Sequence, residues 1–579
     1  MKEEIKNFVS KHFGLILVYI LAYIFVFFLD SYALTYILKL IEGSLPSQRL
    51  IGTIIIVGLL MVGSKVLLNI FHNSLSFLIF QSRMNRLFDF TKRSLNKTYE
   101  SFEDQGFTSK LRRAINFFSS DNQGYQASLA GFIELVPLFV LVVFSGYFLG
   151  RFSLFLLGLS FLINLLAFPL KDQLNDFDLL EDEDLGDIEN RLEYYQSLTT
   201  DTKYAKDIRA FGLKDMILQR YRQLAGEIFE VFSSKTKLAF KVKLPLALLY
   251  IVNDGILLFD LIQNRGSLEA SSLVFILSMY FLFSSSILKA FDLFGELKKN
   301  FSLYETYDDI LNENLQDYSY KIDDGIFTVD FVNVWYKYPG SDDFALKDVN
   351  VSFSSAEKIG ILGENGGGKS TFIKLLIGLF EPTKGQILIN GKNLRGDQRL
   401  KYFASSFQGS RLFPASLRDN LLYMDPKDLN EPRIEEFLSA NGIVNKDRGR
   451  GLSLDDKIGR EFFPKAFTPS GGQEQLLVIL RTLLSPRPMY VFDEPTSALD
   501  IEKELSFYKS LTAIKDRGYI IISHRLSVSN IVDKVIVIGS KTVEALGDSK
   551  TLKDKSPYYR KVLEISEELL GGGTYGSEH

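Results

Sequence analysis

The residues with the clearest chemical purpose form a glycine-rich loop between a predicted strand, Lys358–Leu362, and a helical pattern, Phe372–Leu379. Glycines let backbone N–H groups converge on phosphate oxygens, and a helix N-terminus adds a positive dipole. In this G-x-x-x-x-G-K-[ST] pattern, Lys369 would reach the β- and γ-phosphates and Ser370 would bind Mg²⁺. The predicted phosphate loop consists of Gly363, Glu364, Asn365, Gly366, Gly367, Gly368, Lys369, Ser370 and Thr371.

Two adjacent carboxylates, Asp493 and Glu494, end a second apolar strand that begins at Met489. Asp493 suits the orientation of Mg²⁺, and Glu494, one residue further on, suits a general base that activates water. Taken alone, two acids at a strand end are more often simply solvated. Beside a phosphate loop, they favour nucleoside-triphosphate hydrolysis.

The elements that would position these residues begin after residue 320. Segments Phe327–Val332 and Val349–Phe353 alternate apolar and polar residues as half-buried strands do. They follow an acidic, tyrosine-rich stretch, Glu305–Lys321, which we interpret as a linker. The C-terminal part of the chain is therefore predicted to be a soluble α/β domain.

The N-terminal part is different, because it contains six apolar segments that are each long enough to span a membrane, which takes about 20 residues, and the first two are longer than a bilayer requires. These are Phe13–Leu40, Leu50–Phe80, Ala127–Leu149, Phe152–Leu170, Leu238–Ile262 and Ser271–Leu288. The connection Gln81–Gln126 is long, and its part 81–113 holds eight Lys or Arg residues, whereas the short loops hold one each. The positive-inside rule places the long connections and both termini in the cytoplasm.

The long connections show apolar residues at helical spacing, over Ser82–Lys97 and Leu213–Phe229. We therefore expect the membrane helices to continue into the cytosol. Two polar stretches, Tyr99–Thr108 and Thr200–Ala210, would form the turns of these extensions. Such turns either dock onto a soluble domain or are ordinary solvated turns.

Charges inside the apolar segments are candidates for lining a translocation path, because a charge in a bilayer usually faces a polar cavity or a partner. They are Asp30, Lys65, Glu134 and Asp254. The polar stretch Asn253–Asp254–Gly255 is the strongest candidate. Interfacial or cytosolic positions are the alternative for each of them.

Composition supports the same division. Hydrophobic residues make up 46% of 579 residues, and aromatics make up 13%. The net charge of -4 gives no reason to expect a nucleic-acid partner. The absence of cysteine excludes disulfides, cysteine metal sites and a cysteine peptidase within this chain. The first apolar segment lacks a cleavage-site pattern, so we interpret it as a retained span.

With these features assembled, the chain resembles ABC transporters along nearly its whole length. The resemblance implies that Tyr338 stacks on adenine, that Gln408 senses Mg²⁺ and the γ-phosphate, and that His524 contacts the γ-phosphate. Ser470, Gly471, Gly472 and Gln473 match the signature motif, which caps the ATP of a second cassette, and Ser497–Asp500 match the D-loop. Structural alternatives are a packed tyrosine, a polar loop glutamine and a strand-end histidine.

The resemblance to exporters implies an α-helical membrane domain of six spans with cytosolic extensions, followed by a P-loop cassette with an antiparallel β subdomain and a helical subdomain. We expect the membrane domain at 1–304, a linker at 305–324, the cassette at 325–570 and a flexible tail at 571–579. The two polar turns then match coupling helices. The expected cofactors are ATP and Mg²⁺, and the expected location is a bacterial cell membrane with a cytoplasmic cassette.

The sequence departs from the family at its signature. Pro469 replaces the usual leucine, and Glu474 and Leu476 replace common basic residues. Proline is sterically acceptable before a helix start, whereas Glu474 would bring negative charge near a triphosphate. Residues 457–461 match only loosely the exporter loop that precedes the signature. A chain with an intact Glu494 and an altered signature resembles one member of an asymmetric heterodimer.

The resulting hypothesis is a half-transporter that dimerises and exports an amphipathic or peptide-like substrate by alternating access, coupled to ATP hydrolysis. Two alternatives remain open. One is an importer with an exporter-type fold, for instance for a metal–siderophore complex. The other is a regulatory or sensing subunit whose ATPase gates a partner.

Overall fold

The computed structural model describes residues 2–43, 46–119, 123–200, 202–263, 269–312, 325–421, 431–445, 450–460 and 462–571. The chain divides into two compact units. The membrane unit contains residues 1–95 and 109–313, and the cassette unit contains residues 96–108 and 314–579. Each unit is described by itself.

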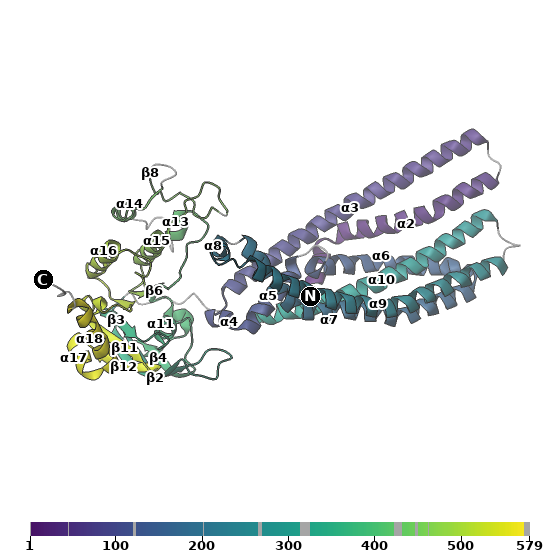
Figure 1. Cartoon of the computed structure of the whole chain (residues 1–579). Helices are drawn as coiled ribbons and strands as arrows, with labels where there is room; N and C mark the ends of the chain where they lie inside the picture. Colours follow the sequence, from purple (N-terminus) through teal and green to yellow (C-terminus); the bar gives the residue numbers. More distant parts are fainter. Residues whose placement is uncertain are drawn as a thin grey trace. The chain divides into compact units, whose positions relative to one another are not determined.

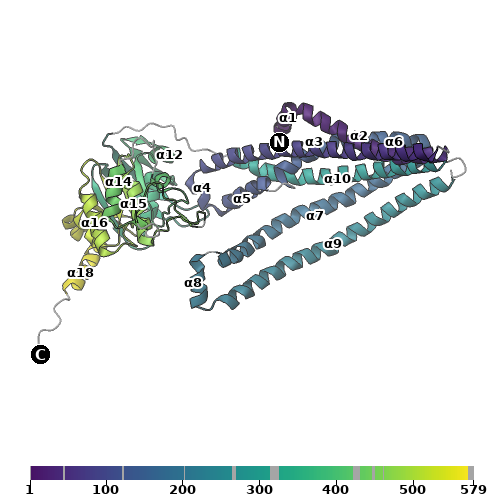
Figure 2. The ribbon, with the colours of Figure 1, turned by 90° about the horizontal axis from the view of Figure 1, so that it is seen from above.

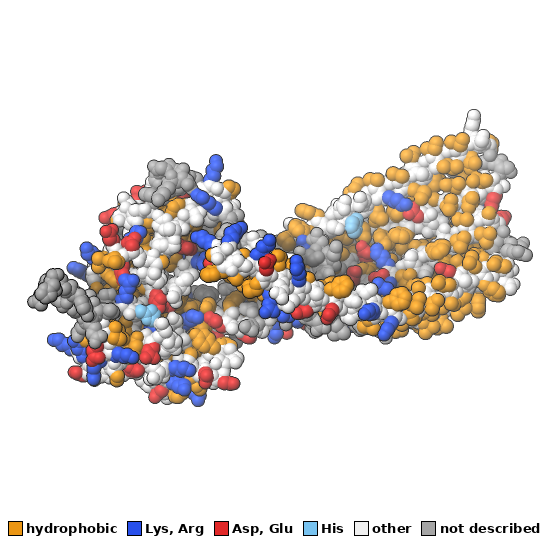
Figure 3. Space-filling model, viewed as in Figure 1, with side chains coloured by type: hydrophobic (Ala, Val, Ile, Leu, Met, Phe, Trp, Pro, Cys, Tyr) orange, Lys and Arg blue, Asp and Glu red, His pale blue; other side chains and the backbone are white. Residues whose placement is uncertain are grey.

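The membrane unit is built from α-helices, most of them long (Figure 1). They are α1 (Lys2–Lys11), α2 (Phe13–Glu42), α3 (Ser47–Leu95), α5 (Gln105–Ser119), α6 (Gly124–Phe152), α7 (Leu154–Thr200), α8 (Thr202–Ala210), α9 (Lys214–Gln263) and α10 (Ala270–Asn312). In the described part of the chain, six of these helices carry a stretch long and apolar enough to cross a membrane, which confirms the six predicted spans. Figure 3 shows hydrophobic side chains over much of the visible face of this unit.

Four of these helices, α3, α7, α9 and α10, contain 49, 47, 50 and 43 residues, well beyond the length that a bilayer requires. Each continues from an apolar span into a more polar segment without a break, because the helical spacing of apolar residues persists. The stretch Asn253–Gly255 does not interrupt α9. Helix α10 runs to Asn312, so residues 305–312, which we expected in a linker, are helical.

The long helices pack in two groups. Helix α10 lies along α6 and also contacts α2 and α7, whereas α9 packs mainly along α7. Figure 2 shows α7 and α9 diverging from the other helices of the unit toward the end that carries α8. The hairpin formed by α7, α8 and α9 therefore leaves its own bundle at one end.

The charges within the apolar segments are paired. Lys65 lies 2.9 Å from Asp30, and Lys289 lies 2.8 Å from Glu134. The hydroxyl of Tyr280 donates a 2.8 Å hydrogen bond to Asp254. Such pairing is the usual way for membrane helices to accommodate charge, because it replaces lost hydration.

The corner between α5 and α6 depends on one glycine. Gly124 has φ +70°, a Cβ at this position would lie 2.0 Å from the carbonyl oxygen of Phe117, and its N–H donates to Asn300 at 2.8 Å. The buried aromatic rings of Phe117, Phe118 and Tyr125 pack around the corner.

We predict that Gly124→Ala destabilises the membrane unit by about 1–3 kcal/mol, through backbone strain and the clash. Gly226→Ala is the matched control, because Gly226 lies within α9 with nothing within 4 Å of its Cβ position, and alanine there favours the helix. Thermal unfolding in detergent should show a lower midpoint for the first variant alone. Equal midpoints for the two variants would contradict this account of the corner.

The cassette unit contains a six-stranded sheet in the order β12-β11-β3-β10-β9-β6 and a four-stranded antiparallel sheet in the order β2-β1-β4-β5. The strands are β1 (Thr328–Tyr336), β2 (Leu346–Ser354), β3 (Lys358–Gly363), β4 (Lys384–Ile389), β5 (Lys392–Asn393), β6 (Phe403–Ser406), β9 (Met489–Asp493), β10 (Tyr519–Ile522), β11 (Lys534–Gly539) and β12 (Thr542–Gly547). A short pair, β7 (Val444–Asn445) and β8 (Arg450–Gly451), lies apart. The expected α/β cassette with an antiparallel subdomain is confirmed.

The cassette unit also contains helices, some of which form the expected helical subdomain. They are α4 (Tyr99–Glu103), α11 (Lys369–Ile377), α12 (Gly396–Arg399), α13 (Leu417–Leu421), α14 (Glu431–Ala440), α15 (Gly471–Leu483), α16 (Ile501–Thr512), α17 (Ser549–Lys555) and α18 (Pro557–Gly571). Helices α13, α14 and α15 share an apolar core that includes Leu417, Ile434 and Leu477. The remaining linker residues, 313–324, and the predicted tail after Gly571 lie outside the described residues.

Candidate nucleotide site

The topology of the six-stranded sheet gathers the predicted catalytic residues at one edge. Strands β3, β10, β9 and β6 are parallel neighbours, so their carboxyl ends meet at the same edge, where open α/β sheets bind ligands. The phosphate loop follows β3, His524 follows β10, Asp493 ends β9 and Gln408 follows β6. Four segments that lie far apart in the sequence thus form one site.

The phosphate loop turns sharply into α11, which begins at Lys369. Gly368 has φ +105°, and a Cβ there would lie 2.6 Å from the side chain of Leu346, so glycine is required. The Lys369 ammonium donates to the carbonyl oxygens of Gly363 at 3.0 Å and Glu364 at 2.8 Å. Burial lowers the pKa of Lys369, although the carboxylates of Glu494 and Asp493 oppose the shift.

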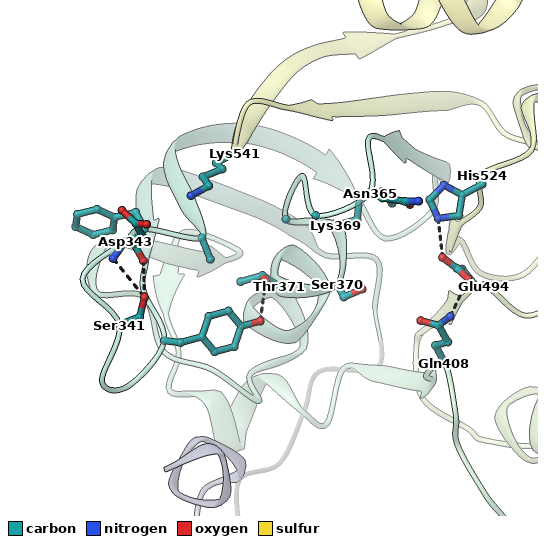
Figure 4. Close-up of a pocket in the computed structure, with 15 residues that line it drawn as sticks. Ser341, Asp343, Asn365, Lys369, Ser370, Thr371, Gln408, Glu494, His524 and Lys541 are labelled. Carbon is teal, nitrogen blue, oxygen red and sulfur yellow. Dashed lines mark hydrogen bonds and ion pairs between the residues drawn. The ribbon is translucent and has the colours of Figure 1, made fainter. Parts of the chain in front are cut away.

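Glu494 is held at one end of the site by two side chains (Figure 4). The amide nitrogen of Gln408 donates to one carboxylate oxygen at 3.0 Å, and Nε2 of His524 lies 2.8 Å from the other. The Glu494 backbone has φ +49°, a left-handed conformation that is unfavourable for residues other than glycine. Backbone strain of this kind is concentrated at functional sites.

Asp493 lies deeper than Glu494, since only 5% of its surface is exposed. Burial raises the pKa of this carboxyl, the adjacent Glu494 adds to the shift, and a hydrogen bond from Ser370 opposes it. The site thus combines a buried carboxylate, a serine hydroxyl and the amide of Gln408. These are hard oxygen donors of the kind that Mg²⁺ prefers, so the residues present fit this ion.

We predict that Asp493→Asn raises the thermal unfolding temperature at pH 7. Because burial raises the folded-state pKa of Asp493, the unfolded chain ionises first, and stability falls as the pH rises through the folded-state pKa. Asparagine removes this cost, and one kcal/mol corresponds to about 2–4 °C for a domain of this size. The difference in unfolding temperature between the variant and the unmodified chain should shrink as the pH is lowered from 7 toward 4. A difference that grows would contradict a raised pKa at Asp493.

The cavity at this edge has a volume of about 510 Å³ and extends from Glu494 and His524 to the segment after β1. Tyr338 lines its far end and hydrogen-bonds Thr371 at 2.9 Å. Besides these residues, the described lining consists of Ser341, Asp343, Phe344, Ala345, Asn365, Gly366, Gly368, Lys369, Ser370, Gln408 and Lys541. Figure 4 shows Lys541 and Asp343 at the end opposite to Glu494.

Sequence reasoning missed Lys541, which lies in the turn between β11 and β12. Its carbonyl oxygen accepts a 2.7 Å hydrogen bond from the Lys347 N–H, so the turn is fixed next to β2. No local motif marks such a residue, because the sheet order alone brings this hairpin beside β3.

The signature residues form a helix start of their own. Ser470 caps α15, and its backbone N–H donates to the Gln473 side chain at 3.0 Å in a capping box. Gly471 and Gly472 begin the helix, and Pro469 precedes the cap without disturbing it. Among the residues that the structure describes, the lining of the phosphate-loop cavity includes none of Ser470–Gln473.

The start of α15 is nevertheless tied to the catalytic strand through Gln475, which sequence reasoning did not single out. Its amide nitrogen donates at 3.2 Å to the Glu494 carbonyl oxygen and at 3.2 Å to the Ser497 hydroxyl, and its oxygen accepts from the Ala498 N–H at 2.9 Å. The D-loop, the signature helix and Glu494 therefore form one connected unit.

Glu474 turns toward the segment after Gln408, where its carboxylate accepts a 3.3 Å hydrogen bond from the Leu412 N–H. Within this cassette, the charge that we expected near a triphosphate is therefore anchored beside the Gln408 loop. The loosely matched loop 457–461 contacts the same region, since the Ile458 N–H donates to the Ala415 carbonyl oxygen at 2.8 Å. Glu461 lies outside the described residues.

A second missed contact supports the His524 loop. Arg525 forms an ion pair with Glu504 of α16, which is buried, and Glu504 also accepts a hydrogen bond from Thr496 at 3.3 Å. Asp500, at the end of the D-loop, caps α16 by accepting from the Lys503 N–H at 2.9 Å. The loops on both sides of Glu494 are thus connected through one helix.

A glycine-rich phosphate loop, an acid pair and a histidine at the ends of neighbouring parallel strands, in a chain that also carries six membrane spans, are the features of a membrane-bound ATPase of the ABC transporter class. Residues 346–497 match the family model described as ABC transporter. The chain therefore carries an ABC transporter nucleotide-binding domain fused to a transmembrane domain, and it binds ATP. It is a multi-pass membrane protein with a cytoplasmic cassette and an ATPase activity coupled to transport.

The chain is similar to two curated transport proteins. It is 28% identical over 496 residues to the subtilin transport ATP-binding protein SpaT of Bacillus subtilis, covering 82% of this chain and 78% of that protein. It is 25% identical over 450 residues to the nisin transport ATP-binding protein NisT of Lactococcus lactis subsp. lactis, covering 73% and 72%. A solved bacterial Atm1-family ABC exporter with ATP bound shares the fold at 16% identity, with a TM-score of 0.76 over 97% of this chain and 99% of that one.

Proposed function

We propose that this chain is one half of an ATP-driven exporter of a peptide-like substrate. The observation that carries the proposal is the similarity to the subtilin and nisin transport proteins, which extends over 82% and 73% of the chain and so includes membrane spans as well as the cassette. A shared cassette alone would support ATP hydrolysis without a cargo class. The paired charges of the membrane unit offer polar contacts for such a cargo along the spans.

The proposed reaction uses residues of this chain in defined roles. Glu494 acts as the general base toward water, and His524 and Gln408 hold its carboxylate in place. Lys369 neutralises phosphate charge, and Tyr338 stacks on the base. Ser370, Asp493 and Gln408 would hold Mg²⁺, which supplies charge neutralisation on the phosphates when bound.

We also propose that two half-transporters work together. Ser470–Gln473 lie outside the phosphate-loop cavity of their own cassette, so they can cap the nucleotide of a second cassette with a helix N-terminus. The hairpin of α7, α8 and α9 supports this arrangement, because it diverges from its own bundle. Closure of the two cassettes around ATP would then favour one orientation of the membrane helices, and hydrolysis would favour the other.

The partner is proposed to be a different chain, because this cassette keeps the residues expected for catalysis but has an altered signature motif. Lys369, Glu494 and His524 are complete, whereas Pro469 and Glu474 alter the signature. Purified alone in lipid nanodiscs, the chain should hydrolyse ATP weakly. The double variant Pro469→Leu/Glu474→Gln, which retains an acceptor for Leu412, should be more active. Full cooperative hydrolysis by the unmodified chain alone would contradict the heterodimer.

Transport direction is tested with inverted and right-side-out vesicles that contain the chain together with its proposed partner chain. Fluorescently labelled nisin is a suitable first probe, given the similarity to the nisin transport protein. We expect ATP-dependent accumulation in inverted vesicles only. Accumulation in right-side-out vesicles loaded with ATP would instead support an importer. ATPase activity without movement of any peptide tested would support a sensing subunit.

A further inference from the structure

Helix α4 (Tyr99–Glu103) groups with the cassette although it lies between two membrane helices in the sequence. Three contacts attach it. The Tyr336 hydroxyl donates to Glu100 at 3.1 Å, the Lys374 ammonium lies 3.1 Å from Glu103, and the rings of Tyr99 and Phe380 lie 5.8 Å apart. Acidic side chains of α4 thus meet a lysine and a tyrosine of the cassette.

Lys374 is the centre of this contact. Its ammonium lies 5.1 Å from the Tyr99 ring centroid and 5.0 Å from the Phe380 ring centroid, as well as beside the Glu103 carboxylate. Its side chain is 22% exposed, so the ion pair is only partly screened by water. Burial opposes the charge, but Glu103 and Tyr99 outweigh it and raise the pKa of Lys374.

The same aromatic cluster reaches the nucleotide cavity. The ring of Phe380 stacks on Tyr336, with centroids 4.8 Å apart and planes at 10°, and meets Tyr338 edge-on at 5.5 Å. Tyr336 and Phe380 are almost fully buried, at 0% and 1% exposure. A shift of the Tyr338 ring therefore moves its neighbours, because close-packed interiors transmit displacement.

Helix α11 provides a second connection between the same two places. Thr371 hydrogen-bonds Tyr338 inside the cavity, and Lys374, three residues later, holds α4. Residues three apart lie on the same face of a helix. One short helix, which begins at the phosphate-binding Lys369, therefore carries both the nucleotide contact and the α4 contact.

We infer that Phe380 and Lys374 are positioning residues that transmit occupancy of the nucleotide cavity to α4, through the Tyr338 ring on one side and α11 on the other. The inference rests on the proposed function in assigning ATP to this cavity and a coupling role to α4. On α4, Glu103 is the partner of Lys374, and Glu100 attaches the helix to the cassette a second time through Tyr336.

The test measures hydrogen–deuterium exchange of residues 96–108 in the full chain in lipid nanodiscs, with and without ATP and Mg²⁺, in a Glu494→Gln background that prevents turnover. We expect ATP to slow exchange in this segment. Lys374→Glu and Glu103→Lys should each abolish most of that change while ATP affinity stays within about threefold, or roughly 0.7 kcal/mol. The charge-swapped double variant should recover it.

Lys534→Met is the matched control, because it breaks a comparable cassette ion pair, with Glu357 at 2.6 Å, that does not involve α4. An α4 response that survives both single substitutions overturns the inference, as does a double variant that folds without recovering the response. Phe380→Leu tests the aromatic connection independently, and we expect it to abolish most of the ATP-dependent slowing of exchange in residues 96–108 as well. Since the readout needs no cargo, a failure to transport labelled nisin counts against the proposed function and leaves this test intact.

Discussion

Replacing Glu494 with Gln is expected to slow ATP hydrolysis by about 10²–10⁴-fold, the usual contribution of a general base, while ATP still binds. Glutamine matches glutamate in shape, so contacts with Gln408 and His524 can still form, but it cannot take a proton from water. The residues that we propose to contact the phosphates, above all Lys369, are unchanged. Steady-state phosphate release and equilibrium binding of a fluorescent ATP analogue measure the two quantities separately.

Glu502→Gln is the matched control for this variant, because Glu502 is exposed in the first turn of α16, eight residues after Glu494 in the sequence. It should leave both hydrolysis and binding unchanged. Near-normal turnover in Glu494→Gln would mean that another group activates the water. Loss of ATP binding in that variant would mean that Glu494 holds the nucleotide instead.

Replacing Lys369 with Ala is expected to act on binding rather than on the chemical step alone, because ATP affinity itself should fall by about 10²-fold or more. A charged hydrogen bond contributes about 1.5–3 kcal/mol, and every 1.4 kcal/mol corresponds to about tenfold in affinity. The ammonium donates to the carbonyl oxygens of Gly363 and Glu364 at the cavity wall, and we propose that bound ATP places two phosphates within its reach.

The control for this second variant is Lys358→Ala. Lys358 begins the same strand, β3, whose other end leads into the phosphate loop, and its ammonium lies over the Tyr519 ring rather than in the cavity. It should retain ATP affinity. If Lys369→Ala retained affinity as well, the phosphate site would have to lie elsewhere on the cassette.

The positions of the candidate site residues in the fold could be predicted from sequence wherever these residues form a contiguous pattern. The phosphate loop, the acid pair after β9 and the cap at Ser470 are local patterns, and each lies in the structure between the elements that its pattern requires. The six spans could be predicted equally well, because a bilayer imposes a length and a composition on each one.

Contacts made by sheet order and helix packing could not be predicted in this way. Gln475 reaches the Glu494 carbonyl oxygen, and Lys541 enters the cavity from a distant hairpin, because the fold brings them there. The end of the membrane unit also lies further along the chain than the sequence pattern predicts. Residues 305–312 are largely polar and acidic, yet they continue α10, with Tyr307 and Ile310 buried against the bundle.

The most direct test of the account is ATP-dependent accumulation of labelled peptide in inverted vesicles that contain this chain and its partner, compared with the Glu494→Gln variant. The account predicts accumulation that requires ATP and is lost in the variant, with ATP still bound. Accumulation that persists in Glu494→Gln, or that proceeds without ATP, would contradict export driven by hydrolysis at this cassette.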